Sequence, residues 1–166
     1  MRLRNHGVVI GGPPCSLNIW LSSSVHRRSL SHPEGDTRNY KVRLSNLIAA
    51  NTACWLTLLR DMGKVFYWAL EQPSPSWLWR LECMIGLTAA FGAARICTWM
   101  AFFGHDMLKP STLMGTLPGL AGMRRVMRKA DRGKFKRRFA WALDDLPSQL
   151  FASHVLALHR PNSIGC

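Results

Sequence analysis

Short apolar runs alternate with longer amphipathic stretches along this chain. Residues 7–10 and 65–70 form apolar runs of strand length, and each run ends at glycine or proline. Between them, from about residue 36 to Gly63, apolar residues recur close to a 3.6-residue period, which predicts a long helix capped by Asp36 or Thr37. The residues expected on its buried face are Leu44, Leu47, Ile48, Cys54, Trp55, Leu58, Leu59 and Met62.

The second half of the chain repeats this alternation. Ser76 can cap a helix that ends near Gly92, and the residues that follow, 94–103 and 112–116, have strand-like content. The predicted order is therefore strand, helix, strand, helix, strand, strand. Nearly continuous apolar strands separated by helices are typical of a parallel sheet covered on both faces, so we expect an α/β fold.

Composition adds the domain organisation and the redox compartment. The chain has 166 residues, 48% of them hydrophobic, which suits one packed domain. We expect that domain over residues 1–120 and a basic, partly helical tail over 121–166, with a helix across 123–139 that is interrupted at Gly133. The five cysteines are odd in number, widely spaced and without a CxxC pair, which favours a reducing compartment, the nucleus or the cytoplasm.

The charge balance predicts a polyanionic partner. Lys and Arg number 22 against 9 Asp and Glu, a formal net charge of +13, so DNA or another nucleic acid is the expected partner. Much of the excess lies within residues 124–138. The candidate phosphate contacts there are Arg124, Arg125, Arg128, Lys129, Lys134, Lys136, Arg137 and Arg138.

Two side chains lie where chemistry is expected, at the carboxyl ends of predicted strands. Cys15 follows Gly11-Gly12-Pro13-Pro14, a turn whose backbone amides could activate a thiol as a nucleophile. Glu71 ends an apolar and aromatic strand, where burial would make its carboxyl a proton donor or a bidentate hydrogen-bonding group. The alternatives are a small core cysteine and a solvated or Arg-paired glutamate.

These motifs resemble the cytosine-5 DNA methyltransferase family. A Pro-Cys turn after one strand and a Glu-Gln-Pro turn after the next are similar to the family's turns, and Lys109-Pro110-Ser111 is similar to a later stretch of divergent members. The resemblance covers about residues 7–118, the second half of the family's catalytic domain. It implies a partial Rossmann-like S-adenosylmethionine methyltransferase sheet.

The resemblance also implies roles for individual residues. Cys15 would add to C6 of a flipped-out cytosine, and Glu71 would grip N3 and the exocyclic amine. Pro13 and Pro14 would lie against the cofactor S-adenosylmethionine. Arg27 and Arg28, in the loop after the nucleophile, would contact phosphates near the opened duplex.

The chain departs from the family in ways that leave other functions open. Only six residues precede Gly7, so we expect this chain to be a fragment or a divergent member whose donor-binding half a second chain would have to supply. Ser16 replaces the Gln that usually follows the nucleophile. A non-catalytic basic module that binds nucleic acid is the first alternative. A membrane protein that spans the bilayer near 83–103 is the second.

Overall fold

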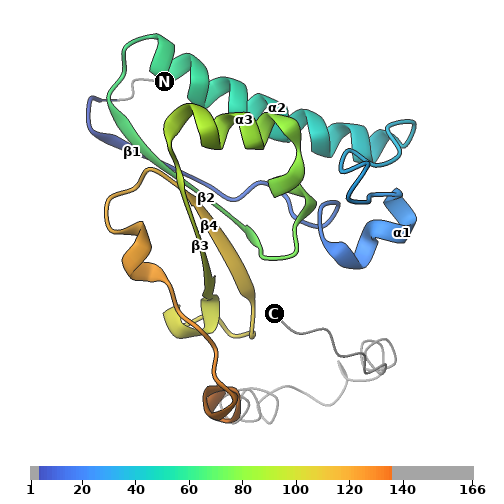
Figure 1. Ribbon diagram of the computed structural model, residues 1–166, viewed down its shortest axis with the longest axis vertical. Helices are drawn as coiled ribbons and strands as arrows, with labels where there is room; N and C mark the ends of the chain where they lie inside the picture. The colour runs from blue at the N-terminus through green and yellow to red at the C-terminus, as the bar shows by residue number, and fades with distance from the viewer. Residues whose placement is uncertain (1–3, 136–166) are drawn as a thin grey trace, which may run out of the picture. The chain divides into compact units, whose positions relative to one another are not determined.

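The computed structural model describes residues 4–135 (Figure 1). Its main elements follow one another as strand, helix, strand, helix, strand, strand, which confirms the predicted order. These six elements are β1 (Gly7–Gly11), α2 (Tyr40–Asp61), β2 (Phe66–Pro73), α3 (Glu82–Phe91), β3 (Ala94–Trp99) and β4 (Pro110–Gly115). The short helices are α1 (Ser23–His26) and the 3-10 turns η1 (Trp20–Ser22), η2 (Trp77–Arg80), η3 (Met100–Phe103) and η4 (Leu120–Met123).

The four strands form one mixed sheet in the order β1-β2-β4-β3. β1 and β2 are parallel, as predicted, whereas β4 is antiparallel to both of its neighbours. The prediction of a wholly parallel sheet is therefore wrong. A parallel connection needs a crossover of about a dozen residues or more, and residues 100–109 between β3 and β4 hold only the short turn η3.

Among the described elements, α2 and α3 lie together on one face of the sheet (Figure 1). Both crossovers step in the same direction across the sheet, and right-handed crossovers that do so place their helices on the same side. On the opposite face, at the β1 edge, Val8 and Ile10 are 49% and 76% exposed. The expectation of helices on both faces is therefore wrong for this part of the chain.

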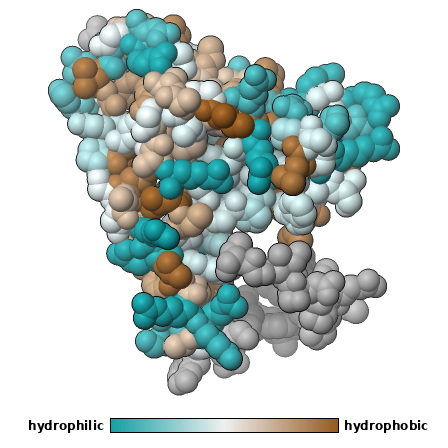
Figure 2. Space-filling model, in the orientation of Figure 1, coloured by the Kyte–Doolittle hydropathy of each residue, from teal (hydrophilic) through white to brown (hydrophobic). Residues whose placement is uncertain are grey.

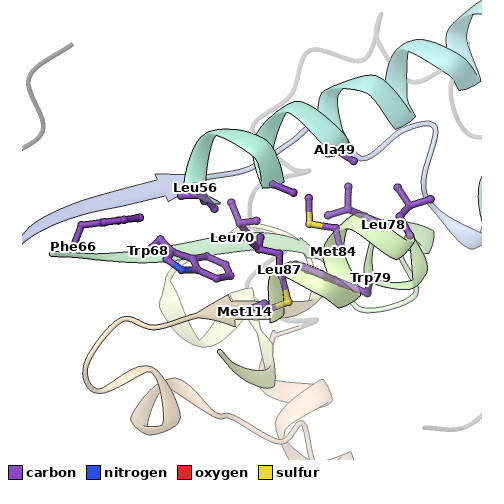
Figure 3. Close-up of a cluster of buried hydrophobic side chains, with 12 residues drawn as sticks. Ala49, Leu56, Phe66, Trp68, Leu70, Leu78, Trp79, Met84, Leu87 and Met114 are labelled. Atoms are coloured by element: carbon purple, nitrogen blue, oxygen red, sulfur yellow. The ribbon is translucent and has the colours of Figure 1, made fainter. Parts of the chain in front are cut away.

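The core lies between β2 and the two helices (Figure 3). Phe66, Trp68 and Leu70 point from alternate positions of β2 toward this layer, as the strand's period of two requires. Met84 and Leu87 of α3 close the cluster from above. The hydrophobic runs of the sequence in 65–70 and 76–92 thus contribute residues to the same core.

The helix α2 packs with a different face from the one predicted. Its buried residues are Val42, Ser45, Ala49, Ala53 and Leu56, whereas Leu44, Leu47, Cys54, Trp55, Leu58 and Met62 of the predicted face are exposed. Small side chains on the buried face leave room for the large rings of β2 beneath the helix. The 3.6-residue period located the helix correctly but not the side that meets the sheet.

Local signals in the sequence had mixed outcomes. Gly92 ends α3 in the left-handed conformation, as predicted. Ser76 caps only η2, its side chain accepting from the Leu78 amide, so the single helix predicted from Ser76 to Gly92 is divided into η2 and α3. The N-cap residue of α2 is Asn39, so the prediction of Asp36 or Thr37 is wrong. The strand expected over 94–103 ends at Trp99.

Residues 83–103 are divided between α3, β3 and η3, so the interpretation as a membrane span is wrong. No helix within residues 4–135 has the length and apolar character needed to cross a bilayer.

One compact unit comprises residues 1–127, and Leu120 and Met127 are buried in the chain. Residues 128–166 group separately. Residues 124–128 are irregular and the helical backbone begins at 129, continuing through Gly133 to the last described residue, so the predicted helix start and its interruption are wrong. Lys136, Arg137 and Arg138 lie outside the described residues.

Candidate functional site

The turn that carries Cys15 lies beside the carboxyl end of β2. The prediction that Glu71-Gln72-Pro73 forms a turn is wrong, because these residues belong to β2 and pair with β4. β1 and β2 are parallel neighbours, with Gly11 opposite Leu70, so the chain leaves both strands at adjacent carboxyl ends. The buried Gln72 side chain joins the end of β2 to the Cys15 turn, because its amide nitrogen donates to the Pro13 carbonyl. Its amide oxygen accepts from the Ser76 hydroxyl at 3.1 Å.

Hydrogen bonds of Asn18 anchor the turn around Cys15. The Asn18 amide donates to the Cys15 carbonyl at 2.8 Å, and the buried Asn18 side chain donates to the Ser45 hydroxyl of α2 at 2.8 Å. The Trp77 amide donates to the Asn18 carbonyl at 2.7 Å. Cys15 itself is half-buried, with a free thiol. A fixed backbone therefore presents a partly accessible sulfur.

Glu71 has a different environment from the one predicted. Adjacent strand residues point to opposite faces, so its carboxylate leaves the sheet on the side away from Gln72. There it forms an ion pair with the Lys109 ammonium, at 3.2 Å to Oε1, and each side chain is about a quarter exposed. The neighbour is a cation from the start of β4, not the apolar pocket that was expected.

Arg27 and Arg28 differ from one another. Arg28 is buried, and its guanidinium donates to the Leu17 carbonyl at 3.0 Å, to the Pro33 carbonyl and to Asn46 Oδ1 at 2.9 Å. Burial lowers its pKa, although the charge of Glu34 opposes that effect. The prediction that Arg28 contacts phosphate is wrong, because its donors hold the loop together. Arg27 is exposed, 3.9 Å from Asp36.

A cavity that sequence reasoning missed lies where the chain leaves β2. It has a volume of about 410 Å³, and its wall includes Trp20, Ser74, Trp79, Arg80 and Arg95. The Trp20 ring stacks on Trp77 with centroids 5.1 Å apart, and the Arg95 guanidinium lies 5.4 Å from the centre of the Trp79 ring. The sequence offered a signal here, the Trp-Leu-Trp-Arg run of η2.

The cavity carries positive charge without a matching acid. Within residues 4–135, neither Arg80 nor Arg95 takes part in an ion pair with a carboxylate. Burial lowers the pKa of Arg95, and the like charge of Arg80 lowers it further. Two such guanidiniums beside aromatic rings are suited to an anion that also carries a flat ring.

The basic residues after η4 are exposed where the structure describes them: Arg124, Arg125, Arg128, Lys129 and Lys134. Arg125 also donates to the Gly122 and Arg124 carbonyls and lies over the Phe103 ring. Their role in nucleic-acid binding stays a prediction. Across the described part of the chain, no three His, Cys, Asp or Glu side chains gather in a way that could hold a metal ion.

Pro13 and Pro14 do not form a site for a methyl donor by themselves. Proline has no amide hydrogen to donate. The Pro13 carbonyl accepts from Gln72, and the Pro14 carbonyl accepts from Asn18 at 3.5 Å. These two residues shape the turn, and their contact with S-adenosylmethionine stays a prediction.

Searches of protein-family models and of curated proteins found nothing that matches this sequence.

Proposed function

We propose that this chain handles a cytosine base in DNA, in the manner of the base-handling half of a cytosine-5 methyltransferase. One observation carries the proposal: the Pro-Pro-Cys turn follows β1, Glu71-Gln72-Pro73 ends the parallel neighbour β2, and Gln72 ties that strand end to the turn. A thiol beyond the end of β1 and a carboxylate near the end of the neighbouring β2 are the groups needed for addition to a ring and for recognition of its polar edge.

The chemistry needs only groups of this chain up to the addition step. The Cys15 thiolate would form a bond to C6 of cytosine, and the electron pair of the C5–C6 double bond would take a proton from water at C5. The Glu71 carboxylate would accept from the exocyclic amine while the adjacent Lys109 ammonium donates toward N3. Loss of the original C5 proton and cleavage of the sulfur–C6 bond would then restore cytosine and thiolate.

Transfer of a methyl group would need a donor site from elsewhere. β1 is an edge strand whose residues Val8 and Ile10 are exposed, so further strands from another segment or a second chain could extend the sheet there. S-adenosylmethionine would supply the methyl group in such an assembly. The base-handling step is testable without it.

The direct test is release of tritium from C5 of cytosine in a single-stranded oligonucleotide, which spares the cost of base flipping. The full chain should release tritium to water, and Cys15→Ser should abolish the release. Cys54→Ser is the matched control, because Cys54 is exposed on α2, away from the turn. Release that survives Cys15→Ser, or none from the wild-type chain, would overturn the proposal.

A second candidate function is non-catalytic binding of nucleic acid, favoured by the cavity of Arg80 and Arg95. An oligonucleotide could stack a base on Trp20 or Trp79 and place a phosphate between the two guanidiniums. Replacing both arginines by Gln should weaken binding in fluorescence anisotropy and reduce the slope of log K against log salt by about 0.7, the value for one phosphate of a single strand.

The control for this candidate removes the same charge from another surface. Lys41 and Lys64 are exposed at opposite ends of α2, and their joint replacement by Gln leaves the cavity unchanged. If the two double variants lose equal affinity, net charge explains the binding and the cavity has no specific role.

A further inference from the structure

The outer face of α2 carries an apolar stripe that the fold leaves exposed. Ala49 and Leu56 point from the helix into the core (Figure 3), and the opposite side of α2 carries the stripe. In this view hydrophobic atoms reach the surface over the helical layer (Figure 2). The stripe consists of Tyr40, Leu44, Leu47, Asn51, Trp55, Leu58 and Met62, whose six apolar members are 39% to 64% exposed.

The positions in this stripe are symmetric about Asn51. Apolar residues stand 4, 7 and 11 positions before it, at Leu47, Leu44 and Tyr40, and 4, 7 and 11 positions after it, at Trp55, Leu58 and Met62. At about 100° per residue, all six lie within about 40° of the direction of Asn51, and the buried face lies at least about 120° away. The spacing of the apolar residues is therefore the same in both directions from Asn51.

We propose that α2 pairs with α2 of a second copy, antiparallel, about a twofold axis at Asn51. A twofold contact brings one patch against itself, so the patch must be self-complementary, and this symmetric spacing meets that condition. Leu47 of one copy would face Trp55 of the other, and Leu44 would face Leu58. The two Asn51 amides would meet at the axis, where a buried Asn fixes the register of helix pairs.

The area available agrees with a specific but modest interface. At their observed exposures the six apolar side chains offer roughly 600 Å² per copy, or about 1,200 Å² for the pair. That total is the lower end of the range for specific interfaces, so we expect dissociation in the micromolar range.

Charge at the ends of the helix also favours the antiparallel arrangement. Arg43 and Asp61 are five turns apart, on the same flank of the stripe. Antiparallel pairing brings the Arg43 end of one helix beside the Asp61 end of the other, and it opposes the two helix dipoles. Parallel pairing would align the two dipoles and leave Arg43 five turns from Asp61 of the other copy. The charge pattern thus selects one orientation.

Sedimentation equilibrium of the full chain tests the proposal. At roughly 100 µM the mass should approach twice the 18.7 kDa of one chain, well above the micromolar range expected for dissociation. Leu44→Glu and Leu58→Lys should each shift the chain to monomer with unchanged far-UV circular dichroism, because both side chains are already partly exposed. Ile85→Glu is the matched control, an exposed apolar residue of α3 outside the stripe, and should leave the dimer intact.

Mixing the variants tests the orientation. Leu44→Glu mixed with Leu58→Lys should restore the dimer, because positions 44 and 58 face each other only in the antiparallel pair. Restoration by Leu44→Glu mixed with Leu44→Lys would indicate parallel pairing and overturn the proposal. A wild-type chain that is monomeric at all concentrations would also overturn it, whatever covers the stripe.

Discussion

Gln72 offers the sharpest test of how the site is built, because its side chain joins the end of β2 to the Cys15 turn. It is 1% exposed, donates to the Pro13 carbonyl and accepts from the Ser76 hydroxyl. Gln72→Leu keeps a similar volume and removes both hydrogen bonds. Each buried partner left unsatisfied costs about 1–3 kcal/mol, so we expect the free energy of unfolding to fall by about 2–4 kcal/mol.

Urea unfolding followed by tryptophan fluorescence measures this loss. With a slope typical of small domains, the midpoint should fall by about 1–2 M. Alkylation of Cys15, read from its peptide by mass spectrometry, should become a few-fold faster at low denaturant, since the turn loses its anchor.

Glu71→Gln is the matched control for stability. Its side chain is partly exposed and makes one ion pair, with Lys109, so its replacement should cost less than about 1 kcal/mol. Equal free energies of unfolding for Gln72→Leu and Glu71→Gln, with unchanged alkylation of Cys15, would refute the view that Gln72 anchors the Cys15 turn to β2.

Three further perturbations test the structure around the site. Arg28→Met removes three hydrogen bonds of a buried guanidinium and should lower the free energy of unfolding by about 3 kcal/mol, and a loss under 1 kcal/mol in urea would contradict that role. Gly115→Ala would place a Cβ 2.0 Å from a backbone carbonyl of β2 and should lower the melting temperature, whereas Gly86→Ala enters open space in α3 and should raise the free energy of unfolding by about 0.4–1 kcal/mol; equal effects would be inconsistent with this packing. A hydrogen bond from Arg38 lowers the pKa of the Asp36 carboxyl to about 2, so its contribution to stability is complete above about pH 4 and is lost as the pH falls toward 2. Carboxyl NMR should show the Asp36 pKa moving back toward 3.8 in Arg38→Gln, and a wild-type midpoint near 4 would count against the pairing.

The sequence predicted the elements of the fold better than their packing. Apolar runs and their glycine or proline ends located β1 and β2, and their parallel pairing placed the Cys15 turn beside the end of β2, which runs three residues further than predicted. The antiparallel direction of β4 was also readable in principle, from the short connection after β3. The buried face of α2 could not be predicted from the sequence, because a periodic stripe of large apolar residues looks the same whether the sheet or another surface covers it.

The candidate site was predictable in its residues but not in its supports. Cys15 follows the end of β1, which the sequence marks with turn residues, whereas Glu71 lies inside β2, two residues before the strand ends. Gln72 and Asn18 act through contacts with residues distant in sequence, and nothing local announces such partners. Arg28 looked like a surface arginine because burial of a guanidinium depends on carbonyls that only the folded loop brings together.

The central claim is that Cys15 adds to a cytosine ring, and a covalent adduct tests it most directly. An oligonucleotide in which nitrogen replaces C5 of one cytosine accepts the proton on that nitrogen after addition at C6, so no methyl donor is needed. We expect a denaturation-resistant complex of one chain and one oligonucleotide, with the oligonucleotide mapped to the Cys15 peptide and absent from Cys15→Ser. An adduct that maps to another cysteine, or no adduct from the wild-type chain, would contradict it.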